Sequence, residues 1–176
     1  SEYGKDVMED SVKGLQLKVS DICSPAASSH FAPVPDKDLH KQSIGFMEDV
    51  QIVGTVMRNQ KRKLYPDLMQ SFRMFLDQCI ESGREELASH TYLYLHTSYP
   101  DLGWDIPALL KEYGISNKTL FSYICRNCNH YMPSFFQGSV IDCHKCGAIR
   151  GATLPNVTFG LTAEQLRDVI CSFDVY

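Results

Sequence analysis

Two closely spaced pairs of cysteines are the residues in this chain best suited to chemistry. Cys125 and Cys128 form one C-x2-C pair, and after fourteen further residues Cys143 and Cys146 form a second. Each short loop can aim two thiolates at one ion, and a hairpin between the loops can bring them together. Gly147 follows the second pair and suits a tight turn in which backbone amides point at thiolate sulfurs. The sequence therefore predicts one structural Zn²⁺ ion bound by these four cysteines.

The neighbouring cysteines and histidines allow other interpretations of this pattern. A disulfide framework requires an oxidising compartment and normally pairs most cysteines, whereas Cys23, Cys79 and Cys171 lie apart from the two pairs. We interpret these three as free cysteines in apolar or linker sequence. His130 and His144 flank the pairs and could replace a thiolate, but with four cysteines present we expect both to lie at the surface or to support the ligands.

The predicted metal site has the features of a structural centre rather than a catalytic one. Four thiolates close the coordination shell, whereas a catalytic zinc keeps one position open for water. The chain contains no H-E-x-x-H, no phosphate-binding glycine loop and no G-x-S-x-G motif. His90 and His96 are available to a cysteine nucleophile, but nothing in the flanking sequence supports that chemistry. The sequence therefore predicts neither an enzyme nor a small-molecule substrate.

Charge limits the range of binding functions. The chain has 17 basic and 21 acidic residues, a net charge of −4, which argues against a surface built wholly to grip a phosphate backbone. One local basic patch stands out, formed by Arg58, Lys61, Arg62 and Lys63. We interpret it as an uncompensated, solvated helix end before Pro66, with a binding patch as the alternative.

A second group of basic side chains accompanies the cysteine pairs. Between residues 118 and 150 there is a single acid, Asp142, and there are four cations: Lys118, Arg126, Lys145 and Arg150. Three aromatic residues lie among them: Tyr131, Phe135 and Phe136. Cations beside stacking surfaces are what single-stranded nucleic acids bind. The alternative is that these aromatic rings pack this region against the rest of the protein.

Helical periodicity and capping signals predict the elements that hold these residues. We expect four helices before the cysteine pairs, at about 44–57, 66–82, 85–97 and 105–113. Residues 119–124 have the pattern of a strand that leads into Cys125, and Thr162 to Gln165 form a capping box that begins a last helix. Alternation over 14–19 indicates a short strand or a pairing peptide, and the stretch 24–36, rich in proline and serine, indicates a linker.

These elements define a mainly α fold with a small β zinc ribbon, of the α+β class. Its predicted parts are a flexible arm over 1–43, a helical body of about four helices over 44–117, the ribbon over 118–152, and a C-terminal helix over 153–176 that packs back. With 44% apolar residues and no apolar run of membrane-spanning length, the composition is that of a soluble protein without a membrane partner. Since the sequence in view carries no secretory leader, we expect an intracellular protein of the nucleus or cytoplasm.

Part of the chain, about residues 65–150, resembles a known family. The resemblance rests on the succession of four segments: Tyr99 to Leu102, Ile106 to Lys111, Tyr123 to Cys128, and Cys143 to Cys146. This order is similar to the zinc-bearing N-terminal region of transposon-derived proteins related to DDE transposases. The resemblance implies an interaction or nucleic-acid-handling module, and it carries no catalytic residue over to this chain.

The sequence favours a non-catalytic zinc-binding interaction or scaffold module for a protein partner, within an intracellular assembly linked to nucleic acid. The acidic helical body suits peptide docking, as do four aromatic residues that could equally form core: Tyr92, Tyr94, Tyr99 and Trp104. The alternative is direct DNA or RNA binding through the basic ribbon. A second alternative is a domesticated or viral regulatory protein that acts on a host partner.

Overall fold

The computed structural model describes residues 2–15 and 31–176, and the chain divides into two units, Ser1–Ala32 and Pro33–Tyr176. The described part of the first unit contains helix α1 (Glu2–Ser11). Most of the strand expected over 14–19 and about half of the linker expected over 24–36 lie outside the described residues. The fold and the candidate sites therefore concern the second unit.

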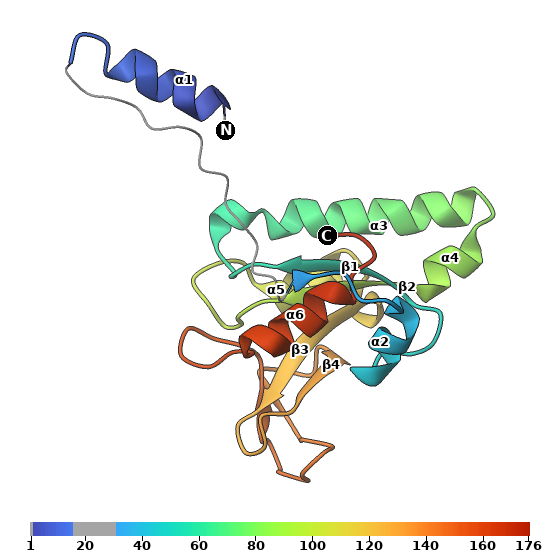
Figure 1. Ribbon diagram of the computed structural model, residues 1–176. Coiled ribbons are helices and arrows are strands. Elements are labelled where there is room, and N and C mark those ends of the chain that lie inside the picture. Colours follow the sequence, from blue (N-terminus) through green and yellow to red (C-terminus); the bar gives the residue numbers. More distant parts are fainter. Residues whose placement is uncertain (1, 16–30) are drawn as a thin grey trace. The chain divides into compact units, whose positions relative to one another are not determined.

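A mixed sheet forms the centre of the second unit (Figure 1). Its strands among the described residues are β1 (Gln51–Val56), β2 (Thr91–His96), β3 (Thr119–Cys125), β4 (Tyr131–Phe135), β5 (Val140–Ile141) and β6 (Ala152–Thr153). The order is β1-β2-β3-β6-β5, and β4 pairs with the opposite side of β3. The first three strands run parallel, whereas β4 and β6 run antiparallel to β3.

Helices cover both faces of the parallel strands (Figure 1). They are α2 (Lys37–Ser43), α3 (Tyr65–Glu81), α4 (Glu85–His90), α5 (Ile106–Glu112) and α6 (Ala163–Cys171), with 3-10 turns η2 (Lys61–Lys63) and η3 (Ser116–Lys118). Three predicted starts are confirmed. Pro66 lies in the first turn of α3, the Asp105 carboxylate accepts from Ala108 N, and Thr162 and Gln165 form the capping box of α6.

Apolar side chains form a separate core on each face of the sheet. On one face, α3 and α5 pack on β2 and β3 through residues that include Met69, Phe72, Leu93, Leu110 and Phe121. On the other face, α6 packs on β1, β2 and β3 through Val169, Ile52, Tyr94 and Leu120. Since both faces are covered, the parallel strands lie in the interior, as parallel strands usually do.

The predicted helix at 44–57 is wrong and the one at 85–97 is confirmed only over Glu85–His90, so the segment 44–117 is not a purely helical body. Gln51–Val56 is strand β1, and the second segment is a helix only as far as His90, after which Thr91–His96 is strand β2. A strand covered on both faces loses the alternation of apolar and polar residues. Val50, Val53 and Val56 therefore matched a helical spacing by chance. The fold is α+β, with a larger sheet than the sequence predicted.

The end of the predicted arm, residues 37–43, is also a helix rather than a linker. Its Lys41 is only 2% exposed, and the ammonium group donates to Val50 O and to Asp174 Oδ2, both at 2.7 Å. Asp174 in turn accepts from the backbone N–H of Ile52 at 2.8 Å. This buried ion pair ties α2 to β1 and to the segment after α6, and nothing in the local sequence signals a pair 133 residues apart.

Strand β3 joins the helix-covered part of the sheet to the cysteine pairs. Its first half pairs with β2, from Thr119 opposite Leu93 to Phe121 opposite Leu95. Its last two residues pair with β6 on the same side, Ile124 opposite Thr153 and Cys125 opposite Ala152. All seven residues of β3 are buried. The predicted strand before Cys125 is therefore confirmed, and it leads directly from the core into the first cysteine pair.

Candidate metal centre

The four predicted cysteines come together at the far end of β3. Cys125 is its last residue, Cys128 lies in the turn to β4, and Cys143 and Cys146 lie in the loop between β5 and β6. Their four sulfur atoms all lie within 4.8 Å of one another. Within residues 2–15 and 31–176 this is the one group of three or more His, Cys, Asp or Glu side chains placed to hold a metal ion.

The two cysteine loops share one backbone pattern. In the first, Asn129 N donates to Cys125 O and Cys125 N donates to His130 O; in the second, Gly147 N donates to Cys143 O and Cys143 N donates to Ala148 O. The residue after each pair has a left-handed backbone, φ 55° at Asn129 and 71° at Gly147. Glycine adopts this conformation without strain, and asparagine tolerates it better than most residues. Each C-x2-C sequence thus forms the same tight turn.

Backbone and side-chain N–H groups point at the sulfur atoms. Asn127 N lies 3.4 Å from Cys125 Sγ, and Asn127 Nδ2 lies 3.5 Å from Cys146 Sγ. His130 N and Ala148 N, one residue beyond each left-handed position, donate to Cys128 and Cys146. Asn127 was not predicted as a ligand-supporting residue. Its position inside the first pair was the only sequence signal for that role.

The sulfur separations fit a tetrahedral ion and do not fit disulfides. Cys125 Sγ lies 3.6 Å from Cys146 Sγ, and Cys128 Sγ lies 3.8 Å from Cys143 Sγ. A disulfide requires about 2.05 Å. Four sulfurs at about 2.3 Å from a central Zn²⁺ lie about 3.8 Å apart by tetrahedral geometry. The arrangement can therefore hold one metal ion of the kind that tetrahedral thiolate sites bind, zinc or iron.

The thiols influence one another strongly because they are crowded. The pKa of Cys146 is lowered to about 6, first by the hydrogen bond from the Asn127 side chain and then by that from Ala148 N. At Cys128 the bond from His130 N lowers the pKa, but burial and the three neighbouring thiols outweigh it and raise the pKa. Four thiolates at this distance repel one another unless a cation lies between them. The donor set thus suits a divalent cation.

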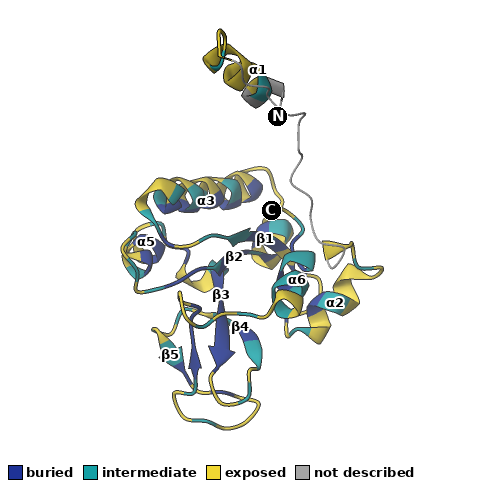
Figure 2. Cartoon of the chain, turned by 60° about the vertical axis from the view of Figure 1, so that its left-hand side comes forward, coloured by how far each residue is buried: buried dark blue, intermediate teal, exposed yellow. Residues whose placement is uncertain are grey.

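One side of the cluster is enclosed and the other faces solvent. Cys125 and Cys143 are buried and belong to the same apolar core as β2 and α3. Cys128 is half-buried and Cys146 is exposed. Figure 2 shows the same contrast, with β3 buried along its length and the loops beyond it largely exposed.

The basic residues predicted near the cysteines fall into two groups. Arg126, Lys145 and Arg150 have exposed side chains on the two cysteine loops. Lys118 does not join them, because its ammonium donates to Ala88 O at 2.9 Å and lies 4.6 Å from the centre of the Tyr92 ring. Burial lowers the pKa of Lys118. Lys118 therefore binds carbonyl groups in the last turn of α4, and the predicted basic surface has one cation fewer.

The aromatic residues predicted as stacking surfaces are mostly packed inside. The Phe136 ring lies 5.5 Å from Phe121 and 5.7 Å from Tyr99, with both pairs edge to face. Tyr131 is partly buried against the core below α6. Phe135 is 37% exposed and lies 6.1 Å from Tyr92. The packing alternative therefore holds for Phe136 and Tyr131.

The patch Arg58, Lys61, Arg62 and Lys63 is not a helix C-terminus and is not uncompensated. It follows β1 and leads through η2 into the start of α3. Arg58 donates to both carboxylate oxygens of Asp101 at 2.8 and 3.0 Å, and the Lys61 ammonium lies 4.0 Å from the centre of the Trp104 ring. Arg62 is exposed and Lys63 is half-buried. The local sequence could not show Asp101, which lies 43 residues away.

No helix in the described ranges combines the length and the hydrophobicity that a membrane crossing requires. In comparisons with known proteins, no family model, no curated protein and no solved structure matches this chain. A function can therefore be inferred only from the geometry of the sites themselves.

Proposed function

We propose that this protein is a non-catalytic binding module in which one Zn²⁺ ion, held in a zinc ribbon by Cys125, Cys128, Cys143 and Cys146, maintains a surface for a protein partner. The observation that carries the proposal is the spacing of the four sulfurs, all within 4.8 Å. With four thiolates around it, the ion has no open position for water or substrate. Its role is therefore to fold the loops on which the proposed surface lies.

The second cysteine loop supplies the most exposed apolar side chain of this end. Ile149 is 83% exposed, three residues after Cys146, while its neighbour Ala148 packs against the core. Arg126, Lys145 and Arg150 surround the same loops with exposed positive charge. An apolar anchor within a charged rim is the arrangement that protein interfaces favour. We infer that an acidic protein surface is the partner, in an intracellular assembly linked to nucleic acid.

A matched pair of variants tests this surface. Ile149→Asp places a charge on the proposed anchor, and Leu102→Asp makes the same change at a residue that is 90% exposed, outside the cysteine loops. A partner isolated with the wild-type protein by cross-linking and mass spectrometry would bind Ile149→Asp at least about thirtyfold more weakly, since an interface hot spot contributes about 2 kcal/mol or more. Equal binding by both variants and wild type would contradict the assignment.

Direct nucleic-acid binding is the second candidate, favoured by the three exposed cations on the cysteine loops. If it is correct, affinity for a DNA or RNA oligonucleotide falls steeply with salt, because each phosphate contact releases counterions. Replacing Arg126, Lys145 and Arg150 together with glutamine would then flatten the salt dependence by about one unit for each lost contact. Micromolar binding at physiological salt that this triple change abolishes, with zinc retained, would promote this candidate over the first.

A further inference from the structure

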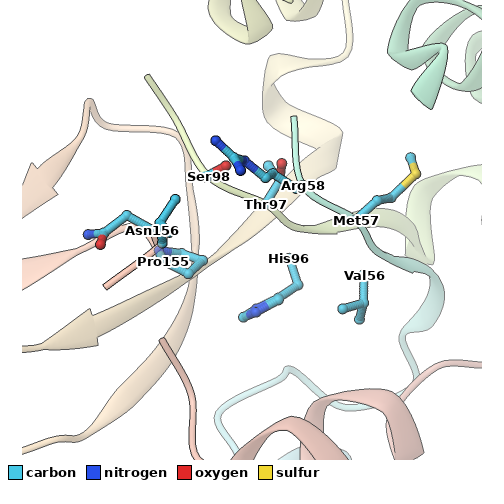
Figure 3. Close-up of a pocket in the computed structure, with 9 residues that line it drawn as sticks. Val56, Met57, Arg58, His96, Thr97, Ser98, Pro155 and Asn156 are labelled. Atoms are coloured by element: carbon cyan, nitrogen blue, oxygen red, sulfur yellow. The ribbon is translucent and has the colours of Figure 1, made fainter. Parts of the chain in front are cut away.

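A cavity whose lining includes no cysteine lies at the carboxyl ends of β1 and β2 (Figure 3). It has a volume of about 290 Å³ and is lined by the ends of both strands, Val56 to Arg58 and His96 to Ser98, and by Pro155 to Val157 after β6. β3 pairs first with β2 and then with β6 on the same side, so the chain leaves a gap where the partner changes. Ligands of open sheets with parallel strands commonly bind outside the carboxyl ends of the strands.

A chain of hydrogen bonds fixes the orientation of His96 in this cavity. The Tyr94 hydroxyl lies 2.7 Å from Ser122 Oγ, and Ser122 Oγ lies 2.8 Å from His96 Nδ1. Tyr94 and Ser122 are buried, and within the described residues Ser122 is the only hydrogen-bond partner of the Tyr94 hydroxyl. A buried hydroxyl proton requires an acceptor, so Tyr94 donates to Ser122 and Ser122 donates to His96 Nδ1. His96 therefore carries its proton on Nε2.

His96 thus offers an N–H donor to the cavity. No hydrogen bond joins its Nε2 to any other described residue, and the ring forms part of the cavity wall (Figure 3). Burial lowers the pKa of His96 to about 4, so the ring is neutral at pH 7 and the donor persists. The sequence did not predict this group because Tyr94 and Ser122 lie 28 residues apart on different strands.

The wall also carries the guanidinium group of Arg58. None of the nine lining residues is acidic, and Arg58 brings a positive charge. Its Nε and Nη2 bind Asp101, which leaves the N–H groups of Nη1 outside that pair. The two hydroxyls of the wall add no donor, because Met57 O takes the single Tyr65 proton so that Thr97 donates to Tyr65 Oη, and Ser98 Oγ donates to Asp101 Oδ2.

The remaining walls are apolar. Val56, Met57, Pro155 and Val157 supply them. A ligand with one anionic, planar group and a small hydrocarbon body would match donors on one side and apolar contact on the other.

We propose that this cavity binds a carboxylate that carries a small apolar group, with His96 Nε2 and Arg58 as its donors. The proposal is independent of the metal and of the partner at the cysteine loops. The same carboxylate chemistry occurs in free short-chain acids and at the C-terminus of a peptide that ends in an aliphatic residue.

Nuclear magnetic resonance on the zinc-loaded full chain at pH 7 tests the proposal with a matched pair of probes, 4-methylpentanoate and 4-methylpentanamide. The acid should shift backbone signals of residues 56–58, 96–98 and 155–157, and the amide should bind at least about tenfold more weakly because it lacks the charge. N-acetyl-leucine represents the peptide C-terminus, and the tighter of the two acids identifies the source. Equal shifts with acid and amide, or shifts elsewhere only, would overturn the proposal.

Two variants test whether 4-methylpentanoate binds in this cavity, and neither of them replaces a buried residue. Asn156→Asp adds a carboxylate at the cavity and keeps the oxygen that accepts from Thr158 N and Phe159 N. It should weaken binding of 4-methylpentanoate about tenfold by repulsion. Asn117→Asp makes the same change on η3, an exposed site that does not line this cavity, and should have little effect. Similar affinities for the two variants would place the acid outside this cavity and overturn the proposal.

Discussion

The helix-covered half of the sheet and the cysteine-bearing end share strand β3, yet different forces hold them. Around β1, β2 and the start of β3, apolar side chains from α3, α5 and α6 cover both faces. At the other end, β5 and β6 have two residues each, and the buried apolar side chains in them or directly after them are few: Ile141, Ala152 and Leu154. Strands this short are not stable alone. The comparison explains why we propose a metal at one end and not at the other.

Replacing one of the buried cysteines should cause the largest loss of structure, and it should do so only in the cysteine-bearing end. Cys143→Ser should abolish metal binding, and because the binding free energy of such a site is also folding free energy, β4, β5 and β6 should lose structure. Thr119 to Phe121 should stay protected because they pair with β2. Hydrogen exchange measured by mass spectrometry would show fast exchange over 126–154 and slow exchange over 66–81.

The matched control is Cys171→Ser in α6, outside the cysteine cluster. Its metal content and exchange over 126–154 should equal those of the wild type. Protection over 126–154 that survives in Cys143→Ser would mean that the loops fold without the metal.

Breaking the ion pair between Lys41 and Asp174 tests the stability of the helix-covered half. Asp174→Asn keeps an acceptor for Ile52 N but leaves only the exposed Asp38 carboxylate near the buried Lys41 ammonium, and breaking a buried pair costs about 3 to 5 kcal/mol. Asp38→Asn removes an exposed carboxylate 3.8 Å from the same ammonium and should cost less than about 1 kcal/mol. Urea unfolding would measure both, with metal content unchanged. Equal losses in the two variants would contradict the account of this core.

The smallest of the three effects is a dependence of stability on pH, and it arises from His96 at the boundary between the two regions. Burial lowers the pKa of His96 from the ordinary value of 6.5 to about 4 in the folded protein, so the unfolded chain takes up a proton first as pH falls. Stability should therefore be full above pH 6.5 and should fall between pH 6.5 and 4, by at most about 3 kcal/mol. His96→Gln should lack this contribution.

Acid also releases a metal from thiolates, but it does so in both proteins. The difference in unfolding free energy between wild type and His96→Gln, followed from pH 7 to pH 5, therefore isolates the histidine. A constant difference over this range would show that His96 is not buried as a neutral ring.

Local signals were sufficient for some features of this fold and insufficient for others. The spacing of Cys125 to Cys146 reflects a turn geometry that a few adjacent residues determine, and the caps at Asp105 and Thr162 depend on side chains three residues from their partners. Strands β1 and β2 were misread because their burial on both faces depends on helices elsewhere in the chain. The pairs Arg58 with Asp101 and Lys41 with Asp174 likewise depend on residues 43 and 133 positions away.

Native mass spectrometry of the purified full chain, combined with elemental analysis and thiol counting after unfolding, tests the central claim most directly. The account predicts one zinc ion per chain, with Cys125, Cys128, Cys143 and Cys146 all recovered as free thiols once the metal is removed. A chain without bound metal, or one with disulfides between Cys125 and Cys146 or between Cys128 and Cys143, would contradict it.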